Sequence, residues 1–175
     1  MAISLTSNGI TSTTSLTKVV NSQTAETIDT LGNAIQNKRV GFKSNPGSTP
    51  QGGTHVSYGN ALSGNFQVGS SFNTTNGRFT APVTGIYHFD WSVMSEGSYS
   101  QTAPQFSIND SLANGCARTL VQSNFGGTHN NASMSVTLYL SAGDYVTTGT
   151  NSNATGKCHA GDWCTFSGYL VGAYN

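Results

Sequence analysis

The clearest pattern along the chain is an alternation of apolar and polar residues between Gly85 and Val93. A period of two is typical of a strand that buries one face. A second alternating run covers 134–140, and shorter runs cover 106–108 and 165–171. Polar turns that contain glycine, such as Ala142-Gly143-Asp144, separate these runs. Several short strands joined in this way predict an all-β sandwich or barrel.

Residues 1–39 follow a different pattern and contain no aromatic residue. Their apolar positions from residue 16 onward suit one face of a short helix, which copies of the chain would bury by self-association. The alternative is an extended arm lying on a neighbour. We therefore divide the chain into a stalk or anchor, 1–39, and a β domain, 40–175, whose first strand is expected at Val40–Lys43. The stalk positions are Leu16, Val20, Ile28, Leu31 and Ile35.

Composition indicates which residue types cover the surface. Only 8% of the 175 residues are charged and the formal net charge is +0, whereas globular proteins average about 25% charged residues. Ser, Thr, Asn, Gln and Gly must therefore cover the surface. A surface with so little charge has no attraction for phosphate backbones, so we expect no nucleic-acid partner. It also gives little repulsion between copies, which favours burial of apolar faces in an oligomer.

The cysteines and the N-terminus indicate the compartment. The chain has 3 Cys, an odd number that does not fit a secreted disulfide framework. Its first residues, MAISLTSNGITSTTS, lack the charged and apolar regions of a signal peptide. No apolar run approaches the ~20 residues that span a membrane. We therefore expect a protein made in a reducing cytosol, with no membrane partner.

One segment has a specific spacing of fixed residues. The stretch from Phe72 to Phe89, FNTTNGRFTAPVTGIYHF, resembles the complement-1q globular head pattern F-N-x-x-x-G-x-F-x-A-P-x-x-G-x-Y-x-F at every fixed position. Two later segments, 141–146 and 165–170, are similar to further motifs of that family and occur in the family's order. The positions that carry the resemblance are Phe72, Gly77, Phe79, Pro82, Gly85, Gly143, Asp144, Phe166 and Gly168.

The motif residues also have a local physical meaning. Asn76-Gly77 is a tight-turn pair. Pro82 ends a strand because it has no backbone donor. Gly85 is expected to adopt a backbone conformation that other residues resist, and Asp144 is expected to form a turn beside Gly143. These motifs therefore predict turns and strand ends that shape the fold, rather than a chemical site.

The resemblance implies a ten-strand jelly-roll sandwich of the complement-1q and tumour-necrosis-factor type. It also implies a tight homotrimer around an axis lined by aromatic residues. Alternation alone does not decide whether a given aromatic residue lies in the core of one domain or at that axis. The candidates for the core or the trimer interface are Tyr87, Phe89, Trp91 and Tyr169.

The segment from Cys158 to Cys164 is the only one that gathers metal-ligand residue types. Three alternatives follow: a zinc site, a disulfide between these two cysteines, or unpaired loop thiols, which the spacing favours. In the resembled family, the loop before the last strand lies near one end of the trimer. We therefore expect an exposed contact loop formed by Cys158, His159, Trp163 and Cys164.

Catalytic chemistry is not expected. The sequence contains no nucleophile elbow, zinc-protease motif or phosphate-binding loop, and the four histidines are scattered. We therefore expect no enzyme activity, no cofactor and no metal. Calcium is the alternative for the acidic residues, although they form no dense acidic loop. They are Asp90, Asp110, Asp144 and Asp162.

The layout of stalk and domain leads to two functional hypotheses. The first is a trimeric structural protein of a bacteriophage virion, a fibre, knob or decoration protein assembled in the host cytoplasm. Its N-terminal arm would attach to other virion proteins, and its jelly roll would stabilise the particle or adhere to a host glycan or protein. The alternative is an extracellular recognition module that binds carbohydrate or protein. Both rest on similarity of layout and composition.

Overall fold

The chain divides into two compact units, Met1–Arg39 and Val40–Asn175. The computed structural model describes residues 16–20, 23–28, 34–35, 40–46, 64–96, 101–102, 104–111, 121–122, 129–150, 157–158 and 161–174. In this described part of the chain the only helical element is a single 3-10 turn, η1 (Gly161–Trp163). No described helix is long and apolar enough to cross a membrane.

The first unit contains strands where the sequence suggested a helix. β1 (Leu16–Val20), β2 (Gln23–Ile28) and β3 (Ala34–Ile35) form an antiparallel sheet in the order β1-β2-β3. The helical alternative for the stalk is therefore wrong at these positions. The apolar spacing suggested a helix, but the residue types were the better guide. Thr, Val and Ile are frequent here, and β-branched residues favour strands. Leu31 lies outside the described residues, and self-association of this unit stays a prediction.

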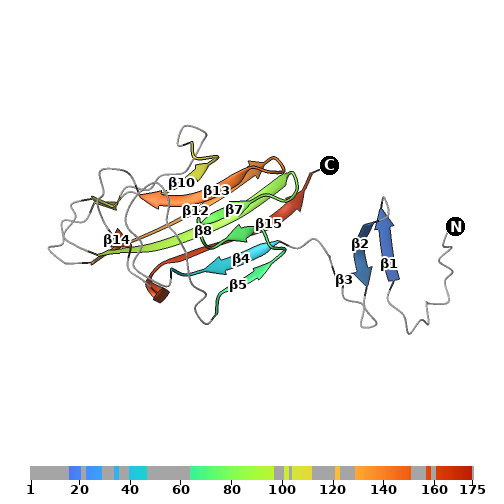
Figure 1. Cartoon of the computed structure of the whole chain (residues 1–175), viewed down its shortest axis with the longest axis horizontal. Coiled ribbons are helices and arrows are strands. Elements are labelled where there is room, and N and C mark those ends of the chain that lie inside the picture. The colour runs from blue at the N-terminus through green and yellow to red at the C-terminus, as the bar shows by residue number, and fades with distance from the viewer. Residues whose placement is uncertain are drawn as a thin grey trace. The chain divides into compact units, whose positions relative to one another are not determined.

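The second unit is built from antiparallel strands, most of which Figure 1 labels. Twelve are assigned among its described residues, against ten expected, and four of the twelve are two-residue segments. They are β4 (Gly41–Ser44), β5 (Phe66–Val68), β6 (Phe72–Asn73), β7 (Arg78–Thr80), β8 (Gly85–Glu96), β9 (Gln101–Thr102), β10 (Pro104–Ile108), β11 (Val121–Gln122), β12 (His129–Leu140), β13 (Tyr145–Thr150), β14 (Lys157–Cys158) and β15 (Thr165–Ala173).

The strands form two main sheets. The larger has the order β12-β8-β15-β4-β5, with β14 paired to β8, and the smaller has the order β10-β13-β7-β6. The first strand of the unit, β4, pairs with the last, β15, through Phe42↔Gly168 and Tyr169↔Gly41. A further pair, β9 and β11, stands apart from both sheets. The larger sheet therefore brings together the first and last strands of the unit, which are far apart in the sequence.

Aromatic side chains fill the space between the two main sheets. Phe79 on β7 lies with its ring centroid 5.1 Å from that of Phe89 on β8, and Phe106 on β10 lies 6.3 Å from Phe89. Phe42 on β4 stacks on Phe72 on β6 at 4.2 Å. Full burial of such a side chain contributes about 1.5–3 kcal/mol. This aromatic core holds the sheets together face to face.

The turn residues of the motif lie where the chain reverses. Gly77 has a φ of 66° in the turn between β6 and β7, and Gly143 has a φ of 93° between β12 and β13. Both values lie in the left-handed region that favours glycine. Asp144 Oδ2 accepts the backbone N–H of Ser141 at 2.8 Å, which closes the second turn. Pro82 follows the end of β7.

Gly85 is required for a different reason from the one expected. Its φ does not lie in the left-handed region, so backbone conformation is not the constraint. A Cβ atom on Gly85 would instead lie 2.5 Å from the carbonyl oxygen of Gly172 and 3.1 Å from Cα of Ala173. Gly85 therefore permits the close approach of β8 and β15 at the end of the sheet.

Candidate interaction surface

The face of the larger sheet that points away from the core forms a continuous surface across five strands. Register places Thr137 opposite His88, and His88 opposite Tyr169. The same row continues from Tyr169 through Gly41 to Val68 on the edge strand β5. A neighbouring row crosses the sheet as Ser135, Asp90, Ser167, Lys43 and Phe66. We call the surface formed by these two rows, extended by Tyr139, the outer sheet face.

Large apolar side chains are exposed on this surface. Tyr139 on β12 is 61% exposed and Tyr169 on β15 is 51% exposed. Phe66 and Val68 on β5 are also exposed, and the ring of Tyr174 lies 6.1 Å from that of Tyr139. Single exposed apolar residues are ordinary, whereas several on one sheet face indicate a surface that another molecule covers.

His88 occupies the middle of the outer sheet face. Its Nδ1 lies 3.0 Å from the hydroxyl of Thr137, and its Nε2 lies 3.0 Å from the hydroxyl of Ser135. Nε2 is also 3.4 Å from Oδ2 of Asp90. The ring of Tyr169 lies 5.4 Å from the imidazole ring. These contacts tie three strands together in one polar cluster between the exposed aromatic residues.

The four aromatic candidates separate into two groups. Tyr87, Phe89 and Trp91 are buried in the core of the single domain, whereas Tyr169 points outward. Burial raises the pKa of Tyr87, and the bond that its hydroxyl donates to the Val83 carbonyl at 2.6 Å lowers it by less. Because the other three are buried, only Tyr169 of the four is available to a partner.

Sequence reasoning did not single out the other exposed residues of this surface. Tyr139 stood on the polar side of an alternating run, beside Ser135 and Thr137. A large aromatic residue among small hydroxyl residues was the available signal. Phe66 and Val68 gave a weaker signal, because β5 is only three residues long.

A second polar cluster lies where the turn after β10 meets β7 and β13. Arg78 Nη2 lies 2.8 Å from Asp110 Oδ2, and the guanidinium stands 4.2 Å from the centre of the Tyr145 ring. The Tyr145 hydroxyl donates to the same Asp110 oxygen at 2.7 Å. That bond is the main reason why the pKa of Tyr145 is raised above 10.0. Asn109 Nδ2 donates to Asp144 Oδ1 at 2.8 Å, so these polar groups fasten neighbouring turns to one another.

The predicted contact loop is only partly exposed. Trp163 is 59% exposed in η1, as a surface anchor would be. Cys164 is fully buried, so its assignment to an exposed loop is wrong. Its Sγ accepts the backbone N–H of Met94 at 3.4 Å and lies 3.6 Å from the Met94 carbonyl oxygen. Cys158 lies in β14, where its backbone pairs with Ser95 of β8, and His159 lies outside the described residues.

The acidic residues considered for calcium are spread over the domain. Asp90 faces His88, Asp110 faces Arg78, Asp144 closes a turn and Asp162 lies in η1. Among the described residues no three His, Cys, Asp or Glu side chains come together as a metal-ligand group. Asp110 and Asp144 instead accept hydrogen bonds from neighbouring side chains and backbone.

Comparison with known proteins agrees with this geometry. The model of the C1q domain family matches residues 47–171. The fold is similar to that of the globular domain of zebrafish complement 1qA, with a TM-score of 0.60, 20% sequence identity, and coverage of 78% of this chain and 98% of that chain. It is also similar to murine APRIL at pH 8.0, with a TM-score of 0.57, 13% identity, and coverage of 77% and 100%. The expectation of a complement-1q and tumour-necrosis-factor type of sandwich is confirmed, and the chain belongs to the C1q domain family.

Proposed function

We propose that this protein is a non-enzymatic homotrimer whose subunits associate through the outer sheet face. The exposure of Tyr139, Tyr169 and Val68 on this one face is the observation that carries the proposal. Burial of apolar surface contributes about 25 cal/mol per Å², so covering these side chains in an obligate interface gives a large favourable term. A trimer would place three copies of Tyr169 near one axis.

The charges on this surface are compatible with close contact between copies. His88 and Asp90 are partners on the same strand, and Lys43 lies two strands away in the row of Asp90. Hydroxyl residues such as Ser135 and Thr137 surround them. Opposite charges within one face limit the repulsion that would arise when identical faces meet.

The proposed setting of this trimer is a bacteriophage virion. The chain would serve as a fibre, knob or decoration protein, assembled in the host cytoplasm, with Met1–Arg39 binding other virion proteins. The division into a small first unit and a jelly-roll unit supports such a role, because it separates attachment from display. The sparsely charged surface, rich in Ser, Thr, Asn and Gly, is a second supporting feature.

Analysis of purified particles tests this setting. Mass spectrometry should find the chain in virions purified by density gradient, in a copy number divisible by three. Antibody against the second unit should decorate intact particles in electron micrographs, because that unit is displayed. A chain found in the infected-cell lysate but missing from the particles would refute the virion role.

Membership of the C1q domain family favours a second candidate, an extracellular recognition module that binds carbohydrate or protein. This role would also use a trimer, and it requires no catalytic groups. Screening the purified protein on glycan arrays and on cell surfaces tests it. Specific, saturable binding without any virion association would support the recognition module. Absence of binding to both the glycan arrays and the cell surfaces would refute it.

A further inference from the structure

An open hollow lies on the outer sheet face, between β8 and β12. Its volume is about 350 Å³. Because one water molecule occupies about 30 Å³ in the liquid, the hollow has room for a long side chain. Two cross-strand pairs surround it, Ser135 with Asp90 and Ser133 with Ser92. The lining residues are Asp90, Trp91, Ser92, Ser133, Met134 and Ser135.

The hollow presents hydrogen-bond acceptors that a partner can reach. Its three serines are exposed, and the side chain of Asp90 is 53% exposed. The two apolar lining residues, Trp91 and Met134, are buried in the core. A serine hydroxyl has two acceptor lone pairs, and a carboxylate only accepts. Asp90 is the only charged lining residue, so the hollow favours a cation with several donors, and a lysine ammonium offers three.

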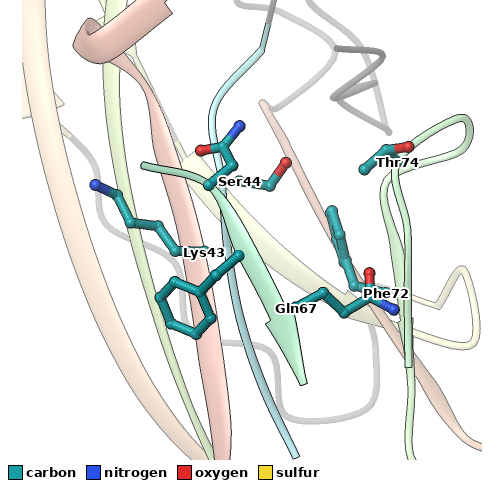
Figure 2. A pocket seen from close by; sticks show the side chains of 7 residues that line it. Lys43, Ser44, Gln67, Phe72 and Thr74 are labelled. Atoms are coloured by element: carbon teal, nitrogen blue, oxygen red, sulfur yellow. The ribbon is translucent and has the colours of Figure 1, made fainter. Parts of the chain in front are cut away.

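Lys43 supplies such a group on the same sheet face. It is partly exposed and alternates with the buried Phe42 and Ser44. In Figure 2 its side chain extends away from Phe72 and Thr74, where β6 of the smaller sheet ends. Within one copy of the described chain Lys43 makes no ion pair, so its charge is open to a partner.

Lys43 and Asp90 lie in one row of the sheet, on either side of β15. Register pairs Ser167 with both of them. Neighbouring strands are about 4.8 Å apart, so the two Cα atoms of one copy are roughly 10 Å apart. A threefold axis along β15, beside Tyr169, brings the β4 flank of one copy against the β8 flank of the next. Rotation about this axis keeps each row at its own height, so Lys43 of one copy meets Asp90 of another.

We infer that the Lys43 ammonium of each copy binds in the hollow of the next copy, where it pairs with Asp90. Both charges lose water when the sheet faces meet, and an unpaired charge in an interface is strongly unfavourable. Pairing between copies satisfies both charges, and the serine hydroxyls accept the remaining ammonium protons. Each copy gives one Lys43 and receives one, so a ring of three closes. The inference rests on the proposed trimer and names the contact that aligns its subunits.

A zero-length crosslink in the full-length protein tests the pairing directly. A carbodiimide joins an amine to a carboxyl group, with loss of water, where the two groups are in contact. Nitrogen-15-labelled and unlabelled chains are refolded together, crosslinked and digested. Peptide mass spectrometry should find Lys43 joined to Asp90 in pairs that carry one labelled and one unlabelled peptide. A link confined to single chains, or a link from Asp90 to a different lysine, would overturn the inference.

Charge reversal supplies a second test. K43E and D90K each bring like charges together in the interface, so each should speed subunit exchange by about tenfold or more. Native mass spectrometry of mixed labelled and unlabelled trimers follows the exchange. The double variant K43E/D90K restores an opposite pair and should exchange within about threefold of the wild-type rate. D162K is the matched control, because it makes the same change at an exposed position in η1 and should exchange as the wild type does.

The remaining outcomes also decide the matter. Single variants that exchange no faster than the wild type, or a double variant that recovers nothing, would contradict the pairing. The crosslink uses the wild-type protein, so it decides the matter even if a variant does not fold. A wild-type trimer without the link between Lys43 and Asp90 would refute this inference alone. A monomeric wild type would refute the proposed function, and this inference with it.

Discussion

Gly168 on β15 lies so close to Phe89 on β8 that no side chain fits between them. A Cβ atom on Gly168 would stand 2.4 Å from Cδ1 of Phe89 and 3.0 Å from Cε1 of Phe42. Register explains the crowding, because Gly168 is paired with both aromatic residues across its two neighbouring strands. The missing side chain lets aromatic residues from both flanking strands pack over Gly168 in the core.

Replacing Gly168 by alanine should therefore destabilise the domain. The methyl group would press against the rings of Phe89 and Phe42, and overpacking of this kind costs about 1–3 kcal/mol of unfolding free energy. Denaturant unfolding measures the loss. G172A is the matched control on the same strand, because nothing lies within 4 Å of the Cβ position of Gly172. Equal stability of the two variants would contradict the packing described for Gly168.

The burial of Cys164 predicts protection of its thiol. In the native protein, iodoacetamide should label Cys164 very slowly, because the sulfur is inaccessible and hydrogen-bonded to the Met94 backbone. In denaturant the same residue should react at once. Peptide mapping by mass spectrometry after timed labelling follows this residue separately from the other cysteines. Rapid labelling of the native protein would mean that the loop is open, as the sequence had suggested.

The contact between Tyr145 and Asp110 predicts an alkaline effect. A raised pKa means that the folded state favours the protonated phenol, so this contact stabilises the fold below pH 10.0 and is lost as pH rises through the folded pKa. D110N should lower the pKa of Tyr145, because it removes the charged acceptor of the phenol hydrogen bond. Carbon-13 NMR titration of labelled tyrosine measures this pKa. D162N, an exposed change in η1, should leave it unchanged, and an equal response to both variants would argue against the assigned cause.

A charge in the outer sheet face should separate the subunits without unfolding them. Y169E would place a carboxylate in each copy of the proposed interface, and an uncompensated buried charge costs about 3–5 kcal/mol. The variant should elute as a monomer with the circular dichroism spectrum of the wild type. T80E is the control, because Thr80 is exposed on the smaller sheet. A trimeric Y169E would place the interface elsewhere.

The longer strands of the second unit were predictable because they carry their own local pattern. Tyr87, Phe89 and Trp91 alternate with polar residues, so β8 was visible without tertiary information. The helix expected in the first unit was wrong because five apolar residues can be fitted to a helical period by chance. Its β-branched content was the better guide, as β1 and β2 show.

The candidate surface was less predictable than the fold. Alternation indicates that Tyr169 and Phe166 lie on opposite faces, but not which face is covered by a second sheet. The burial of Cys164 depends on Met94, 70 positions away, and no local pattern reports such a contact. The requirement for Gly85 was predicted, yet its cause is the Gly172 carbonyl on another strand. Long-range contacts of this kind arise only when the strands pair.

The mass of the purified protein in solution tests the central claim most directly. Size-exclusion chromatography with light scattering should give three times the chain mass of 18.2 kDa, and the value should persist on dilution to low micromolar concentration. A stable, soluble species of 18.2 kDa would contradict the claim, because the exposed aromatic residues of the outer sheet face would then need no partner.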